Sequence, residues 1–218
     1  MEEGYESLYR KYGKSNPSLS FTEKVKKVMT SPTEFFEKIK GEEGIGEAFK
    51  YYIIFSLIYN LLFGTLTVFG LSGVPIEEMG PFAVLGIFLP IVSFILSLFS
   101  VFIITGIIHV FAMVFGGKGD YSATFKAMAY GATPSLLFGW LPFVGPIFSI
   151  YSLYLQLKGI SALHQVSMGR AFLIIFLIPL IIVIILFMLG FFFLSAIFTP
   201  SILGAPTGQF IHVLRIFI

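Results

Sequence analysis

Three polar residues offer the best prospects for chemistry in an otherwise apolar chain: His109, Asp120 and His164. Histidine and aspartate side chains bind metal ions and transfer protons near neutral pH. Ionisable groups at membrane depth are costly, which makes them candidates for function. For each residue taken alone, the sequence favours a structural role. If the chain has a polar site, we predict that these three residues form it, on the cytosolic side of a membrane.

The spacing of the histidines argues against a metal centre. His109, His164 and His212 are never three or four residues apart, and no carboxylate is spaced to complete a site on the same helix. The chain also has no cysteine, which excludes disulfides, thiol catalysis and cysteine-ligated metals. We therefore predict neither a metal nor a cofactor.

A short motif before the third apolar segment resembles a protease signature. The sequence GKGD, from Gly117 to Asp120, matches the G-x-G-D signature of intramembrane aspartyl proteases. Those enzymes need two carboxylates that share a proton, whereas Asp120 is the only aspartate in the chain. We expect Asp120 to cap the helix that follows it. No Walker loop, G-x-S-x-G elbow or H-E-x-x-H motif occurs, so we predict that the protein is not an enzyme.

The composition indicates a membrane protein. Of 218 residues, 56% are apolar and 12% are charged, against about 25% charged in an average soluble domain. Residues 1–50 hold 9 of the 14 Lys and Arg and 9 of the 12 Asp and Glu, so the rest of the chain is nearly free of charge. A segment this apolar is solvated by lipid. The net charge of +2 is too small to favour nucleic acid as a partner.

Five apolar segments are long enough to cross a bilayer as helices. They are Ala48–Gly70, Phe82–Phe115, residues 121–139, Pro146–Leu163 and Ala171–Phe198. The second is too long for a single span, so we expect its first eight residues to lie along the interface, with a kink at Pro90. We expect the third segment to be kinked near Pro134.

Basic residues near the ends of these segments predict the orientation. Residues 1–50 hold nine of them, and the 116–126 and 158–170 connections hold two each, whereas the 71–81 and 139–145 connections hold none. We predict an all-α integral membrane protein, a five-transmembrane-helix bundle with the N-terminus in the cytosol and the C-terminus outside. The expected organisation is a polar and amphipathic segment at 1–47, the bundle at 48–199 and an interfacial tail at 200–218.

Two short amphipathic helices are predicted before the first span. In one of them Phe21, Val25 and Val28 recur at helical spacing, with lysines between them. The other begins at Ser31-Pro32-Thr33-Glu34, which fits a capping box with proline at the first helical position. The helices either lie in the headgroup layer or pack on the cytosolic end of the bundle, and the sequence leaves both arrangements open.

Small residues recur every four positions in the third segment: Ala123, Ala127, Gly131 and Ser135. This spacing places them on one face of a helix. In lipid, a face of small residues lets another helix approach closely. We therefore predict that these four residues are the packing face of the central helix. Lys126 on the same helix is expected to extend its side chain to the interface.

A stripe of hydroxyls, Ser93, Ser97 and Ser100, lies on the second segment. Helix packing explains such a stripe better than a pore does, because hydroxyls hydrogen-bond across helices in lipid. A channel would need a continuous polar path through the middle of the membrane, whereas the polar residues here gather toward the cytosolic side. A small ion, metal or solute channel or transporter that uses the polar cluster is therefore the alternative function.

The order of the segments resembles a known family. The second segment is followed by GGKGDYSATFKAMAYGATP, a WLPFVGP turn and a fourth segment that ends in IYSLYLQLKGISALHQVSMGRA, and SPTEFFEKI precedes the first segment. Over about residues 31 to 195, this pattern resembles the Yip domain family, membrane proteins named for their interaction with Ypt/Rab small GTPases. The resemblance rests on order and spacing, not on catalytic residues.

The resemblance implies a non-catalytic membrane protein that organises the bilayer or binds partners, in the manner of a membrane-trafficking scaffold. The partners it implies are membrane lipids, another membrane protein, a small GTPase or a second copy of the chain. The cysteine-free composition, rich in Lys and Glu at the N-terminal end, favours a prokaryotic member. Such a member would lie in the cell membrane, and a eukaryotic one in early secretory membranes.

Overall fold

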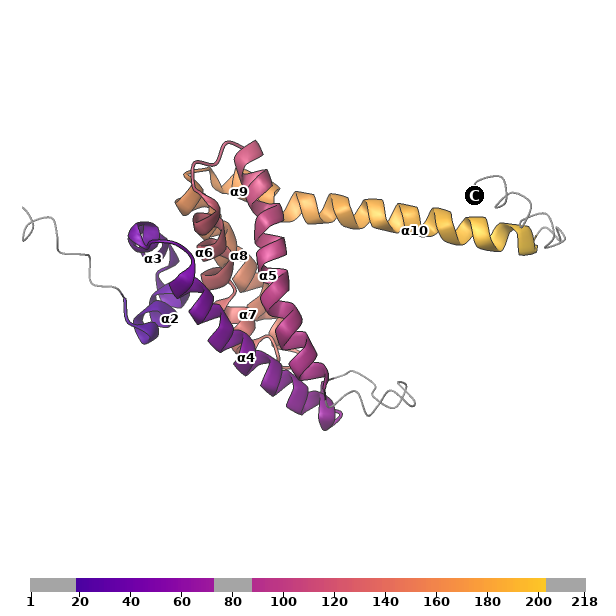
Figure 1. Ribbon diagram of the computed structural model, residues 1–218, viewed down its shortest axis with the longest axis horizontal. Helices are drawn as coiled ribbons and strands as arrows, with labels where there is room; N and C mark the ends of the chain where they lie inside the picture. Colours follow the sequence, from indigo (N-terminus) through magenta and orange to yellow (C-terminus); the bar gives the residue numbers. More distant parts are fainter. Residues whose placement is uncertain (1–18, 73–87, 203–218) are drawn as a thin grey trace, which may run out of the picture. The chain divides into compact units, whose positions relative to one another are not determined.

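The computed structural model describes residues 19–72 and 88–202, and every regular element in these two ranges is a helix (Figure 1). The predicted all-α class is therefore confirmed. The chain forms two units, residues 1–174 and 175–218, and each is considered by itself. The expected interfacial run at 82–87, His212 and most of the expected tail at 200–218 lie outside the described residues.

The helices follow the apolar segments closely. In chain order they are α2 (Phe21–Thr30), α3 (Pro32–Lys38), the 3-10 helix η1 (Ile39–Gly41), α4 (Gly46–Val68), α5 (Leu89–Val114), α6 (Tyr121–Gly131), α7 (Thr133–Phe138), α8 (Gly145–His164) and α9 (Met168–Phe172). A π-helical segment (Leu173–Leu177) then leads into α10 (Ile178–Ile202).

Three of the described helical stretches are long and apolar enough to cross a membrane: Gly46–Val68, Leu89–Val114 and Met168–Ser195. The other two predicted spans correspond to α6 with α7, and to α8. The count of five spans and their orientation therefore stay predictions. The last stretch includes α10, which is apolar on all sides, as suits a helix surrounded by lipid.

Helix α6 lies at the centre of the first unit, where it contacts α4, α5, α7 and α8. Where α6 meets α8, the two backbones are so close that a larger side chain would not fit between them. A Cβ atom at Gly131 would lie 2.8 Å from a backbone nitrogen of α8, and one at Gly159 would lie 2.8 Å from the Cβ of Ala127. Beyond the end of α6, the backbone nitrogen of Ser135 donates to the Ser152 hydroxyl at 2.7 Å. Ala127, Gly131 and Ser135 of the predicted packing face therefore contact α8.

Polar side chains join α4 and α5 along their length. The hydroxyls of Ser56 and Ser97 are 2.7 Å apart, and the Ser93 hydroxyl donates to the side-chain oxygen of Asn60 at 2.5 Å. Two members of the serine stripe are therefore used in helix packing. Their partners on α4, Ser56 and Asn60, are themselves four residues apart, a spacing from which the sequence could have revealed the matching stripe.

Pro90 begins a helix instead of kinking one, and the expected kink is wrong. Helix α5 starts at Leu89, which places Pro90 in the first turn, where its missing N–H needs no partner. Its ring lies 2.0 Å from the position that a Cβ of Gly64 would occupy. The proline and the glycine thereby bring α4 and α5 into direct contact at this end.

The expected bend near Pro134 is a break between two helices. Helix α6 ends at Gly131 and α7 begins at Thr133, with Pro134 in its first turn. Because proline has no N–H, the carbonyl of Tyr130 loses its usual helical partner. The Thr133 hydroxyl donates to that carbonyl at 2.6 Å. The break therefore leaves this carbonyl satisfied, and it is not a free ligand for an ion.

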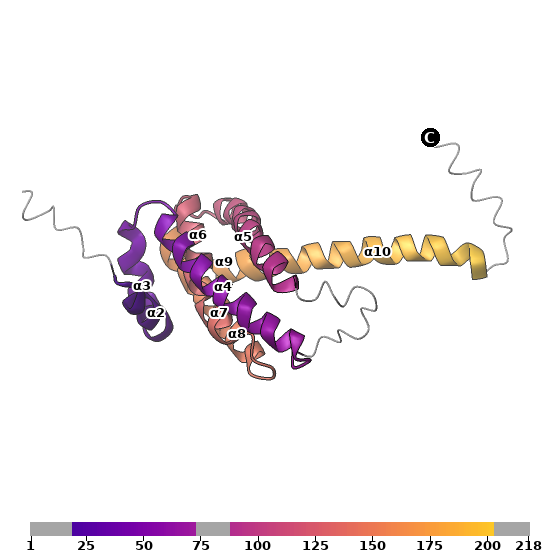
Figure 2. The same ribbon diagram turned by 60° about the horizontal axis from the view of Figure 1, so that its bottom comes forward.

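Helices α2 and α3 pack on the bundle, which is one of the two arrangements that the sequence left open (Figures 1 and 2). Val28, Phe35 and Phe36 have no exposed surface. Helix α2 contacts α7 and α3 contacts α8. The Tyr151 hydroxyl of α8 donates to the carbonyl of Met29 at 2.5 Å. Protein therefore covers much of the apolar faces of these helices, although Phe21 at the start of α2 is exposed.

The predicted capping box at Ser31 is wrong. Ser31 precedes α3, but its side chain makes no capping hydrogen bond, and the Glu34 carboxylate bonds to Lys27 of α2 at 2.5 Å instead. The capping box lies at the start of α2, where the Ser20 hydroxyl accepts from the backbone of Glu23 and the Glu23 carboxylate accepts from the backbone of Ser20.

Gly131→Ala tests the contact between α6 and α8. The added methyl group would overlap the backbone of α8, so we expect the free energy of unfolding in detergent to fall by about 1–3 kcal/mol. Gly106→Ala on α5 is the matched control, because nothing lies within 4 Å of the position of its Cβ. Equal thermal stability of the two variants would contradict the close contact.

Candidate functional site

Two of the three predicted site residues share one hydroxyl group. His109 Nδ1 and His164 Nε2 each lie 2.8 Å from the Thr124 hydroxyl, and the two ring centres are 5.9 Å apart. His109 belongs to α5, Thr124 to α6 and His164 to the last turn of α8, so these bonds join three helices. Thr124 was not among the residues predicted to form the site.

The Thr124 hydroxyl can hydrogen-bond to both rings only if its roles toward them differ. It has one proton, so it donates to one imidazole and accepts from the other. Two neutral rings satisfy this requirement. His164 is fully buried and no carboxylate is hydrogen-bonded to it in the described part of the chain, which favours its neutral form. The pair is therefore arranged as a structural link between helices.

The other nitrogen of His164 faces the turn between α5 and α6. Nδ1 is buried and has no hydrogen-bond partner. A Cβ atom at Gly117 would lie 2.8 Å from it and one at Gly119 would lie 3.1 Å from it, while the backbone nitrogen of Lys118 donates to the His164 carbonyl at 3.0 Å. The turn is glycine-rich because the imidazole packs directly on its backbone.

Asp120 has a separate role as a helix cap, as predicted. Its carboxylate accepts a hydrogen bond from the backbone nitrogen of Ala123 at 2.9 Å and another from the Ser122 hydroxyl. The Ala123 bond is the main cause that lowers the pKa of the Asp120 carboxyl, and the Ser122 bond adds to it. Among the described residues, no hydrogen bond joins Asp120 to either histidine, and no group of three or more His, Cys, Asp or Glu side chains could hold a metal ion.

A buried charged cluster, not predicted from the sequence, holds the N-terminal segment to α6. Lys24 of α2 is 4% exposed, forms an ion pair with Glu42 and donates to the Tyr130 hydroxyl at 3.0 Å. The Tyr130 hydroxyl donates to the second carboxylate oxygen of Glu42 at 2.9 Å. Lys126 of α6 is 3% exposed and donates to the Glu42 carbonyl at 2.6 Å. We call Lys24, Glu42, Lys126 and Tyr130 the buried clamp.

The expectation that Lys126 extends to the interface is wrong, because its ammonium group donates to the Glu42 carbonyl inside the protein. Lys24 is one of the lysines that lie between the apolar residues of α2 in the sequence. It lies three residues after Phe21 and four before Val28, which places it on the apolar face. That spacing is the sequence signal for a buried lysine.

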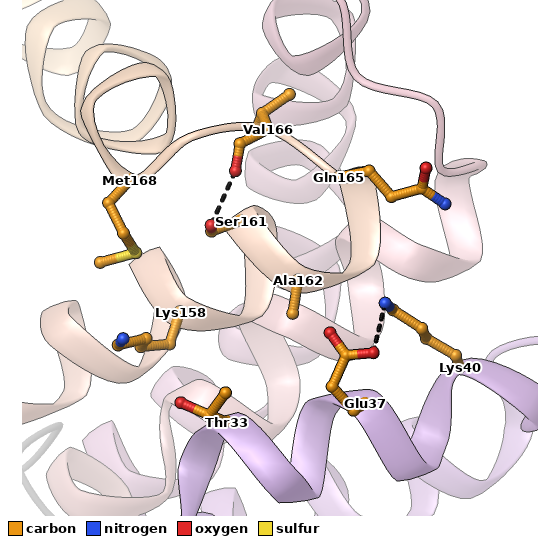
Figure 3. A pocket seen from close by; sticks show the side chains of 9 residues that line it. All are labelled: Thr33, Glu37, Lys40, Lys158, Ser161, Ala162, Gln165, Val166 and Met168. Atoms are coloured by element: carbon orange, nitrogen blue, oxygen red, sulfur yellow. Dashed lines mark hydrogen bonds and ion pairs between the residues drawn. The ribbon is translucent and has the colours of Figure 1, made fainter.

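Two cavities open near the end of α8, and one of them borders the buried clamp. The first, of about 340 Å³, lies between α3 with η1 and the last turns of α8, and Figure 3 shows the side chains around it. The second, of about 420 Å³, is lined by Glu42 and Lys126 of the clamp and by Asp120. Lys40 and Gln165 line both cavities. The two cavities together make one polar face, which we call the polar end of the first unit.

A profile of the Yip1 domain matches residues 26–192 of the chain. This match covers well over half of the sequence and includes the histidine pair, both cavities and all of the buried clamp except Lys24. No curated protein and no solved structure matches the chain.

Thr124→Val tests the link between the two histidines. It removes the shared hydroxyl with little change in volume, and each buried polar group left without a partner costs about 1–3 kcal/mol. We therefore expect a lower melting temperature in detergent. Thr124→Ser retains the hydroxyl and should keep most of the stability. An equal loss in the two variants would show that the Thr124 methyl group, not its hydroxyl, is what matters.

Proposed function

The chain belongs to the Yip1 domain family, and from this premise we propose that it is a non-catalytic integral membrane protein that binds lipids or other membrane proteins at its cytosolic face. The observation that carries the proposal is the buried clamp. The clamp fixes the N-terminal segment to α6, and its residues Glu42 and Lys126 line one of the two cavities of the polar end. Such a face suits the binding of a partner at the membrane surface.

The contacts at the polar end give little support for catalysis or for transport. One ring nitrogen of each histidine bonds to the shared hydroxyl, and the Asp120 carboxylate accepts from the backbone of α6. In a channel the serines of α5 would line a path, but Ser93 and Ser97 bond to α4. We therefore propose a scaffold, with lipids, a second membrane protein, another copy of the chain or a small GTPase as the candidate partners.

We propose five spans with the N-terminus in the cytosol. Helices α6 and α7 together cover residues 121–138, about 27 Å at 1.5 Å per residue, which is close to the thickness of a bilayer core. The three connections rich in basic residues meet at one end, because Glu42 bonds to α6 and the Lys118 backbone bonds to the end of α8. Basic connections favour the cytosolic side. The polar segment at 1–47 then lies inside and the tail at 200–218 outside.

Labelling of single cysteines tests this topology, because the chain has no cysteine of its own. Lys118→Cys and Ser167→Cys lie at the polar end, and Phe143→Cys lies in the turn between α7 and α8, where Phe143 is 96% exposed. In intact cells, a maleimide that cannot cross membranes should label Phe143→Cys at once and the other two only after permeabilisation. Labelling of Lys118→Cys and Phe143→Cys from the same side would overturn the five-span proposal.

A further inference from the structure

The cavity between α3 and α8 carries an excess of positive charge. Lys40 of η1 and Lys158 of α8 line it from different elements, and Glu37 is the one carboxylate among its lining residues (Figure 3). Lys40 is paired with Glu37 at 2.5 Å. Lys158 has no carboxylate within ion-pair distance in the described part of the chain, and its ammonium group lies 5.7 Å from the centre of the Tyr154 ring. The cavity thus presents an ammonium group that lacks an anion.

Two other side chains of the cavity lining also have free hydrogen-bonding groups. Within the described ranges, no hydrogen bond engages the side chains of Thr33 and Gln165, and both line the cavity. The Ser161 hydroxyl, by contrast, already donates to the carbonyl of Val166 at 2.7 Å. Gln165 ends α8 with φ at 55°, a conformation in which glycine is the usual residue. A glutamine at this place adds an amide donor at the rim.

The position of the cavity along the chain indicates the source of its anion. Met168 also lines the cavity, and it is the first residue of the apolar stretch Met168–Ser195 that is able to cross a membrane. The start of a span lies at the level of the lipid headgroups, where lysine side chains reach the phosphates. A cavity of about 340 Å³ is large enough for a headgroup and too small for acyl chains.

We propose that this cavity binds the phosphate group of an anionic phospholipid, with Lys158 and Thr33 as donors. On binding, the Lys40 ammonium group leaves its ion pair with Glu37 and pairs with the phosphate instead. The proposal rests on the proposed function of the polar end and names the ligand for it. Phosphate groups also occur in soluble molecules, and the experiment below separates the two sources.

Native mass spectrometry of the full chain in detergent tests the site with two lipids, dioleoylphosphatidylglycerol and dioleoylphosphatidylcholine. We expect one phosphatidylglycerol to bind more tightly than phosphatidylcholine. Lys158→Gln should weaken this binding about tenfold, because it removes a charge-assisted hydrogen bond to the phosphate. Lys158→Arg, which keeps the charge, should restore most of it. Lys26→Gln is the matched control, because Lys26 is an exposed lysine of α2 that does not line the cavity.

Three results would overturn the proposal. They are equal affinity for the two lipids, an equal loss in Lys26→Gln and Lys158→Gln, or displacement of the lipid by glycerol 3-phosphate or inorganic phosphate at the same concentration as by phosphatidylglycerol. The last result would assign the cavity to a soluble phosphate. Cysteine labelling of the topology does not depend on Lys158. Loss of the lipid site therefore leaves the proposed membrane orientation standing, and a wrong orientation would not produce a defect confined to Lys158→Gln.

Discussion

The burial of Lys24 against Glu42 is the interaction on which the rest of the polar end depends. Removing two opposite charges from water costs several kcal/mol per ion, and their attraction offsets this only when every remaining hydrogen bond is made. Tyr130 bridges the pair, and Lys126 binds the Glu42 carbonyl. Loss of Glu42 would leave the buried Lys24 ammonium group with only the more distant carboxylate of Glu47, at 3.8 Å, so we expect it to destabilise the fold. The cluster thus fixes α2 and the segment around Glu42 to α6, while Phe35 and Phe36 pack α3 on the bundle.

The parts of the fold that local rules govern could be predicted from the sequence. Lipid requires apolar, internally hydrogen-bonded helices, so composition and length were enough to find them. The cap at Asp120 also depends only on residues next to it. Local rules fail where two sites compete: Ser20 and Ser31 are both followed by glutamate three residues later, but Glu34 is taken by Lys27 and only Ser20 forms a capping box.

The sequence indicated which faces of two helices pack, but not the partner of each residue, because the partners are far apart in the chain. His109 and His164 were selected as candidates, but nothing in their spacing indicated that Thr124 would lie between them. Lys24 and its partner Tyr130 are 106 residues apart in the sequence. The polar end therefore emerges only from the packing of α2, α3, α6 and α8, and the binding that we propose for it depends on that packing.

Hydrogen exchange of the backbone amides in α2 and α3 tests the buried clamp most directly. Slow exchange from Phe21 to Lys38 is predicted for the full chain in detergent. Tyr130→Phe removes the hydroxyl between Lys24 and Glu42, and it should speed exchange in this range while leaving α4 and α5 protected. Two results would contradict the role of the buried clamp. In the unchanged protein, the amides of α2 and α3 would exchange as fast as those of an unstructured peptide. In Tyr130→Phe, their protection would stay the same.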